Sequence, residues 1–174
     1  LNAALMISDV NPNSSINIEM LKEVNQVQIG GLGEVLRAFQ PHFLSYGGVL
    51  MGISSFSALS PPINDPRLAY PASKAYLDMA LRCLRSEWTQ KVKVVTVHLG
   101  HMGIIGSTFF SRQIVPSYQE CAEVIVRSLE KEKIPNEINY PPLYCAVYKF
   151  LFKFLPDSWY FALFKIVLKL IKLK

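Results

Sequence analysis

The order of its apolar segments constrains the fold of this chain more than any other feature. Two short apolar runs, at residues 48–55 and 93–99, have the length and composition of buried strands. Between them, Pro71 to Glu87 has the length and periodicity of a helix. A strand–helix–strand order favours parallel strands covered by helices. The sequence therefore predicts an α/β fold whose site lies at the carboxyl ends of the strands.

Two further helices are predicted, one before the first strand and one after the second. The first, from about residue 16 to 43, contains Gly30, Gly31 and Gly33. Each glycine costs about 1 kcal/mol relative to alanine within a helix, so we expect either a bend or close backbone contact there, or a locally weak helix. The second runs from about residue 118 to 131 and carries apolar residues at helical spacing.

Charge separates the chain into two parts, although its 174 residues and 51% apolar content suit a single domain. Residues 1–139 hold 12 of the 18 Lys and Arg residues and 12 of the 13 Asp and Glu residues, so the net charge of +5 belongs to residues 140–174. Nucleic-acid-binding proteins normally carry a basic face on the folded body, so we expect no nucleic-acid partner. The three cysteines are widely spaced, without Cys-x-x-Cys or a suitably placed His, and predict no metal site.

Tyr70 and Lys74 are the residues whose side chains are best suited to catalysis. On a helix that begins near Pro71 they lie one turn apart on the same face. An ammonium near a phenol favours the phenolate, which makes tyrosine a usable proton donor and acceptor near neutral pH. Ser54 and Ser55 end the preceding strand, at the edge of the sheet where such a site is expected.

The serine-containing strand end, the Tyr-x-x-x-Lys segment and the strand ending at Gly100 together resemble the catalytic half of the short-chain dehydrogenase/reductases. The resemblance runs from Asn2 to about Thr108, and more loosely to about Tyr140. It implies a Rossmann-like doubly wound parallel sheet, truncated at the amino terminus, with a helical carboxyl-terminal extension. We therefore expect residues 1–140 to be the carboxyl-terminal part of such a domain and residues 141–174 to form a basic amphipathic helical tail.

The resemblance implies that Ser55, Tyr70 and Lys74 are catalytic. Tyr70 would give a proton to a carbonyl oxygen, Lys74 would lower the pKa of Tyr70, and Ser55 would hydrogen-bond the same oxygen. Ser54 and Ser57 remain alternatives to Ser55, because the loop that follows is slightly longer than the family pattern.

A nicotinamide cofactor, NADP or NAD, is also implied, with Asn2, Tyr70, Lys74 and Met102 as its contacts. The glycine-rich turn that holds the pyrophosphate in this family would precede Asn2. We therefore expect the 174-residue chain alone to bind dinucleotide weakly.

The sequence departs from the family pattern at the asparagine of the preceding helix, which helps to relay protons to the lysine. Gln28 occupies that register, and Asn25, one turn earlier, is the alternative. His101, after the second strand, is either an acid–base or substrate-binding group or an ordinary loop histidine.

The tail contains two apolar segments with lysine stripes, residues 147–155 and 161–173. Neither reaches the roughly 20 uncharged residues that a membrane-spanning helix needs. Helices lying in a membrane surface fit better, and docking on the domain or on a partner subunit is the alternative.

The tail and residues 118–126 resemble reductases of the 11-beta-hydroxysteroid dehydrogenase type. This implies an oxidoreductase for a lipophilic alcohol and carbonyl, located at a membrane such as the endoplasmic reticulum. The alternatives are a non-catalytic membrane-docked scaffold and an inactive fragment. Both a monomer and a homodimer are compatible with the sequence.

Overall fold

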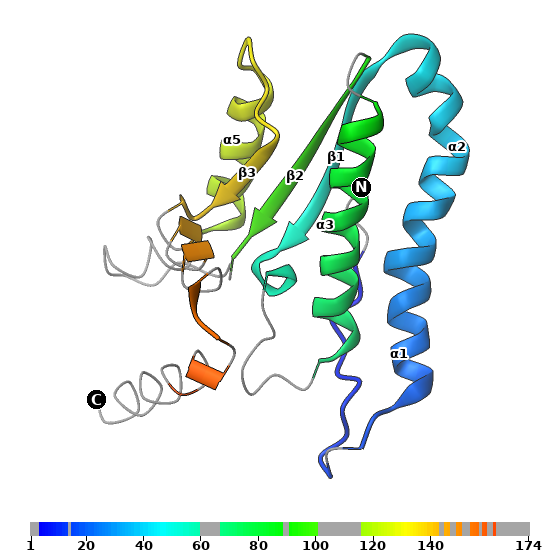
Figure 1. Ribbon diagram of the computed structural model, residues 1–174, viewed down its shortest axis with the longest axis vertical. Helices are drawn as coiled ribbons and strands as arrows, with labels where there is room; N and C mark the ends of the chain where they lie inside the picture. The colour runs from blue at the N-terminus through cyan, green and yellow to red at the C-terminus, as the bar shows by residue number, and fades with distance from the viewer. Residues whose placement is uncertain are drawn as a thin grey trace.

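The computed structural model describes most of the domain and part of the tail. The described residues are 4–13, 15–59, 67–88, 91–100, 116–142, 145, 146, 149, 150, 154–156, 158, 159 and 162. Within them, a three-stranded parallel sheet has helices on both faces (Figure 1). The strands are β1 (Gly48–Ser55), β2 (Val92–Leu99) and β3 (Glu137–Tyr140), in that order across the sheet.

One face of the sheet is covered by α2 (Gly31–Tyr46) and α3 (Ala69–Glu87), and the other by α5 (Tyr118–Leu129) (Figure 1). Alternate strand residues point to opposite faces and form two separate apolar cores. The core under α2 and α3 contains Leu32, Leu50, Leu77, Leu81, Val92 and Val94. The core under α5 contains Val95, Val97 and Ile138. The predicted α/β fold with a parallel sheet is confirmed.

The first helix begins two residues later and ends three residues later than predicted, and it is interrupted at Gly30. It consists of α1 (Ile18–Asn25), a π-helical turn η1 (Gln26–Gly30) and α2, which ends at Tyr46. The expected irregularity is therefore a single widened turn, a feature that is frequent at functional sites. Gly47 ends α2 with a φ of 75°, a conformation that glycine adopts without strain.

The other predicted elements occur with shifted ends, and β3 is an addition. The helix α3 begins at Ala69 instead of Pro71, β2 begins one residue earlier at Val92, and α5 ends at Leu129. A capping box between Ser117 and Glu120 fixes the start of α5. No helix among the described residues is long and apolar enough to cross a membrane.

Candidate active site

Tyr70 and Lys74 lie together in the first turns of α3. The Lys74 ammonium is 5.8 Å from the centroid of the Tyr70 ring, so the two side chains lie on the same side of the helix. Tyr70 is half-buried, whereas Lys74 is only 4% exposed. The sequence-based pairing of these residues therefore holds in the structure.

A single described hydrogen bond holds the Lys74 side chain against the sheet. Its Nζ donates to the carbonyl oxygen of Ile53 at 2.8 Å, which ties α3 to the end of β1. Burial lowers the pKa of Lys74 below its usual 10.5, and the nearby Asp78 carboxylate opposes that shift. The site thus keeps a cation in a poorly solvated position one turn from a tyrosine.

Ser55 is the last residue of β1, two residues beyond the carbonyl group that binds Lys74. Its Oγ accepts hydrogen bonds from Ser57 N at 3.2 Å and Ser57 Oγ at 2.8 Å. The short helix η2 (Phe56–Ala58) follows and packs against α3, which brings this strand end to the helix that carries Tyr70 and Lys74.

The two alternatives to Ser55 have different surroundings. Ser54 is 3% exposed, and its Oγ has no hydrogen-bond partner among the described residues. Ser57 is half-buried and uses its hydroxyl to bind Ser55. The assignment of the catalytic serine to Ser55 stays a prediction.

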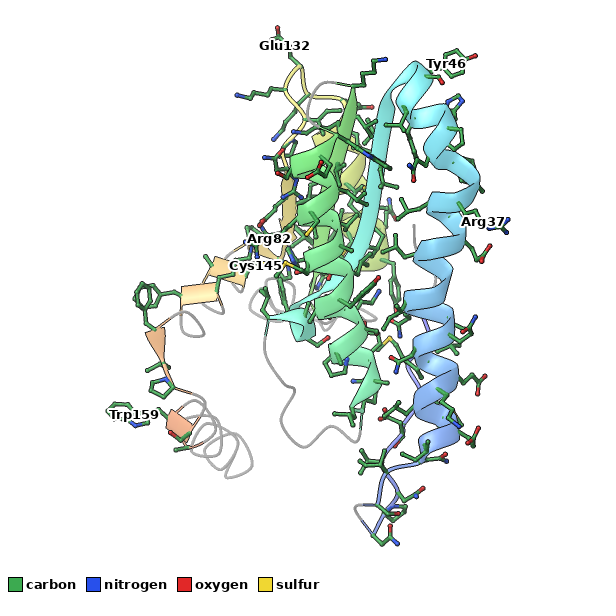
Figure 2. All side chains as sticks on the ribbon, turned by 45° about the vertical axis from the view of Figure 1, so that its right-hand side comes forward. Arg37, Tyr46, Arg82, Glu132, Cys145 and Trp159 are labelled. Atoms are coloured by element: carbon green, nitrogen blue, oxygen red, sulfur yellow. The ribbon has the colours of Figure 1, made fainter. Side chains whose placement is uncertain are left out.

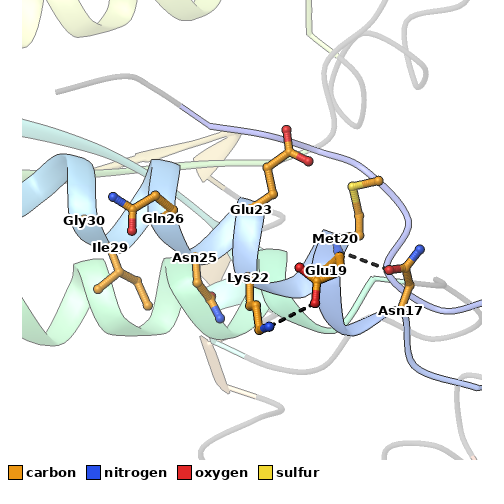
Figure 3. Close-up of a pocket in the computed structure, with 9 residues that line it drawn as sticks. All are labelled: Asn17, Glu19, Met20, Lys22, Glu23, Asn25, Gln26, Ile29 and Gly30. Atoms are coloured by element: carbon orange, nitrogen blue, oxygen red, sulfur yellow. Dashed lines mark hydrogen bonds and ion pairs between the residues drawn. The ribbon is translucent and has the colours of Figure 1, made fainter.

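Of the two candidates on the first helix, Gln28 forms a described hydrogen bond with α3. Its Oε1 accepts a hydrogen bond from Ser73 Oγ at 2.8 Å, and its Nε2 donates to Leu5 O at 3.1 Å. The π-helical turn η1 carries this buried side chain. Asn25 instead lines a groove of about 980 Å³ along α1 and η1 (Figure 3). That groove contains none of the three predicted catalytic residues.

Asn2, His101 and Met102 lie outside the described residues. Their assignments stay predictions. The described residues contain no cluster of His, Cys, Asp and Glu side chains suited to a metal ion.

Sequence reasoning missed a second cation near the tyrosine. The Arg67 guanidinium carbon lies 5.2 Å from the centroid of the Tyr70 ring. A residue three positions before Tyr70 on the same helix would lie near its ring. Because the helix was predicted to begin near Pro71, Arg67 was not placed on it.

Two long-range polar contacts of α3 were also missed. The carboxylate of Asp9 binds the amino terminus of the helix. Farther along, Asp78 Oδ2 is 2.6 Å from His98 Nε2, and His98 Nδ1 is 3.0 Å from Asn139 Oδ1. This second network joins α3 to β2 and β3. No local sequence pattern marks either contact.

Comparison with solved structures shows the same fold at low sequence identity. Serine dehydrogenase from Escherichia coli matches with a TM-score of 0.66 and 18% identity, over 82% of this chain and 62% of that structure. A short-chain dehydrogenase from Burkholderia cenocepacia J2315, in complex with NADP, matches with a TM-score of 0.66 and 21% identity, over 88% of this chain and 64% of that structure. The chain therefore spans less than two thirds of the length of these similar structures.

A comparison with family models gives a match in sequence. No curated protein matches the chain. The model of the short chain dehydrogenase family matches residues 1–114, which include the Tyr70–Lys74 segment and both of the long strands. The chain belongs to the short-chain dehydrogenase family.

Proposed function

We propose that the protein is an NAD(P)-dependent oxidoreductase that interconverts a lipophilic alcohol and the corresponding carbonyl compound. The observation that carries the proposal is the buried Lys74 ammonium beside Tyr70, at the end of the strand that carries Ser55. Membership of the short-chain dehydrogenase family supports the same chemistry.

In the direction of reduction, the Tyr70 hydroxyl gives its proton to the carbonyl oxygen. The positive charge of Lys74 stabilises the phenolate left behind, and its burial strengthens that interaction. The Ser55 hydroxyl donates a hydrogen bond to the developing alkoxide. The nicotinamide, when bound, supplies the hydride to the carbonyl carbon. In the direction of oxidation, Tyr70 accepts the proton from the alcohol.

The surroundings of Lys74 fit the ribose of a nicotinamide nucleotide. An ammonium has three N–H donors, and the described contacts of Lys74 use one of them, for Ile53 O. The remaining donors suit a pair of neighbouring hydroxyl groups. Similar structures include complexes with NADP and, for a 4-hydroxyisoleucine dehydrogenase at 19% identity, with NADH and succinate. We propose either nucleotide, NADP or NAD, as the cofactor.

The tail supports a lipophilic substrate and a membrane location such as the endoplasmic reticulum. Phe150 and Phe154 are 65% and 62% exposed, with ring centroids 4.9 Å apart. Exposed aromatic side chains among lysines suit the head-group region of an anionic membrane. A substrate dissolved in that membrane would then be available to the enzyme.

Replacement of the tyrosine tests the proposed chemistry in the full-length protein. Tyr70→Phe removes the proton donor and keeps the ring, so we expect kcat to fall by a factor of about 10² to 10⁴. The dissociation constant of the nicotinamide nucleotide, measured by fluorescence titration, should stay within about twofold. Tyr76→Phe, at a 47% exposed position on the same helix, is the matched control and should leave kcat unchanged.

Retention of full activity by Tyr70→Phe would overturn the assigned role. If the wild-type protein bound neither NADP nor NAD, the enzyme proposal would fail, and the non-catalytic scaffold would be the better interpretation.

A further inference from the structure

Asp9 is a fully buried carboxylate that the proposed chemistry does not use. Its exposed fraction is 0%, and each of its oxygens accepts one backbone hydrogen bond. Oδ1 binds Leu68 N and Oδ2 binds Ala69 N, both at 2.6 Å. Such short, charge-assisted bonds compensate the cost of burying a carboxylate.

These bonds cap the helix that carries the catalytic tyrosine. The first backbone N–H groups of a helix have no partner within it, and its amino terminus favours a negative charge. In α3 the residue at the cap position is Leu68, whose side chain cannot accept a hydrogen bond. The acceptor comes instead from Asp9, about 60 residues earlier in the chain.

A closed loop fixes the position of Asp9. Its carbonyl oxygen accepts a hydrogen bond from Asn17 N at 2.8 Å, and Val10 forms a bridge with Ile16. Asn17 in turn caps α1, because its Oδ1 accepts a hydrogen bond from Met20 N at 3.1 Å. One loop therefore holds the starts of α1 and α3, which lie side by side at the same end of the molecule (Figure 1).

The cap acts on the residue next to the proposed proton donor. Ala69, whose N–H binds Asp9, directly precedes Tyr70. Lys74 is held independently, by its bond to Ile53 O. Loss of the cap would therefore loosen the tyrosine while the lysine stayed in place, and their alignment would be lost.

We propose that Asp9 is a positioning residue that holds the first turn of α3 and so aligns the Tyr70 hydroxyl with the reacting carbonyl. The inference rests on the proposed function. A second contact supports a link between this amino-terminal segment and α3: Gln28 bridges Leu5 O and Ser73 Oγ.

The test compares two helix caps in the full-length protein. Asp9→Ala removes the cap of α3, whereas Ser117→Ala removes the cap of α5, on the opposite face of the sheet. Below the melting temperature of both variants, we expect Asp9→Ala to lower kcat by about 10- to 100-fold, since small displacements of a catalytic group have effects of this size. Nucleotide affinity should stay within about twofold. Ser117→Ala should keep the wild-type kcat.

Asp9→Asn serves as the conservative variant, and it also serves if the alanine variant does not fold. It keeps one oxygen acceptor for two N–H groups, so we expect a kcat between those of Asp9→Ala and the wild type. Hydrogen exchange gives a readout without activity: the amides of Leu68 and Ala69 should be protected in the wild type and exchange faster in the Asp9 variants.

Equal kcat values for Asp9→Ala and Ser117→Ala would overturn the inference, as would a parallel loss of kcat and nucleotide affinity in Asp9→Ala. If the wild-type protein shows no turnover, the proposed function fails. Hydrogen exchange at the Leu68 and Ala69 amides then tests only whether Asp9 caps α3. If these amides exchanged without protection in the wild type, the cap and the inference would both be contradicted.

Discussion

At the scale of single residues, Lys74 carries the most informative electrostatic environment in the chain. Burial lowers its pKa below 10.5, and Asp78 only partly offsets the shift. Between the lowered pKa and 10.5, the unfolded chain binds more protons at this residue than the folded one. The contribution of Lys74 to the free energy of unfolding therefore rises with pH across that window, and the full penalty is present below it.

Lys74→Met removes this titration and keeps an apolar side chain of similar length. We expect the free energy of unfolding of the wild type, relative to that of Lys74→Met, to increase as the pH rises towards 10.5. Urea denaturation of both proteins at several pH values from 7 to 10 measures the difference, in which groups common to both proteins cancel. A difference that stayed constant or decreased with pH would contradict the assigned environment.

The same scale shows which site residues the sequence reveals. Tyr70 and Lys74 are found because one helical turn separates them, and helix geometry then dictates that they share a face. Asp9 and Ala69 are 60 positions apart, so only the folded chain shows their contact. Asp9 lies in a loop rich in turn-forming residues, where an aspartate is usually a solvated side chain. No sequence pattern there shows that it caps a distant helix.

At the scale of elements, the packing of α3 on β1 depends on the absence of a side chain at Gly52. A Cβ placed there would overlap Leu81 Cδ1, and Leu81 is fully buried. Overpacking of this kind costs about 1–3 kcal/mol. We therefore expect Gly52→Ala to lower the free energy of unfolding by that amount, as measured by urea denaturation.

Gly33→Ala is the matched control for this substitution. A Cβ at Gly33 meets nothing within 4 Å, and the residue is exposed on α2. Because alanine is the better helix former, we expect Gly33→Ala to raise the free energy of unfolding by about 1 kcal/mol. If Gly52→Ala had the same free energy of unfolding as the wild type, α3 and β1 would be farther apart than described.

The elements themselves were predictable where their patterns are long. The runs that form β1 and β2 and the periodicity of α3 fix the parallel arrangement to within two residues at each predicted end. The strand β3 was missed because its four residues, Glu137–Tyr140, alternate polar and apolar side chains too briefly to be told from a loop. What makes these residues a strand is their pairing with β2, a long-range contact that the local sequence does not show.

At the scale of the whole molecule, the uneven distribution of charge separates the body from the tail. The excess of positive charge belongs to residues 140–174, which include six lysines and one aspartate. Within the described tail, Lys149 pairs with Glu137 of β3 at 2.6 Å, whereas Phe150 faces solvent. A basic tail with exposed aromatic rings on an otherwise balanced body favours contact with an anionic membrane.

Trp159 offers a direct measurement of that contact. It is 68% exposed and projects from the tail away from the folded body (Figure 2). The chain has two tryptophans, so Trp88→Phe leaves Trp159 as the single reporter. With vesicles containing phosphatidylserine, we expect its emission to shift to shorter wavelength and the protein to float with the vesicles.

Changing Lys165, Lys169 and Lys172 to glutamate provides the charge control, since it reverses the attraction and keeps the apolar residues. We expect this variant to lose flotation, because each lysine near an anionic surface contributes about 1 kcal/mol to binding. Higher salt should weaken binding of the wild type in the same direction. Equal flotation of both proteins, or an unshifted Trp159 emission, would instead favour docking of the tail on protein.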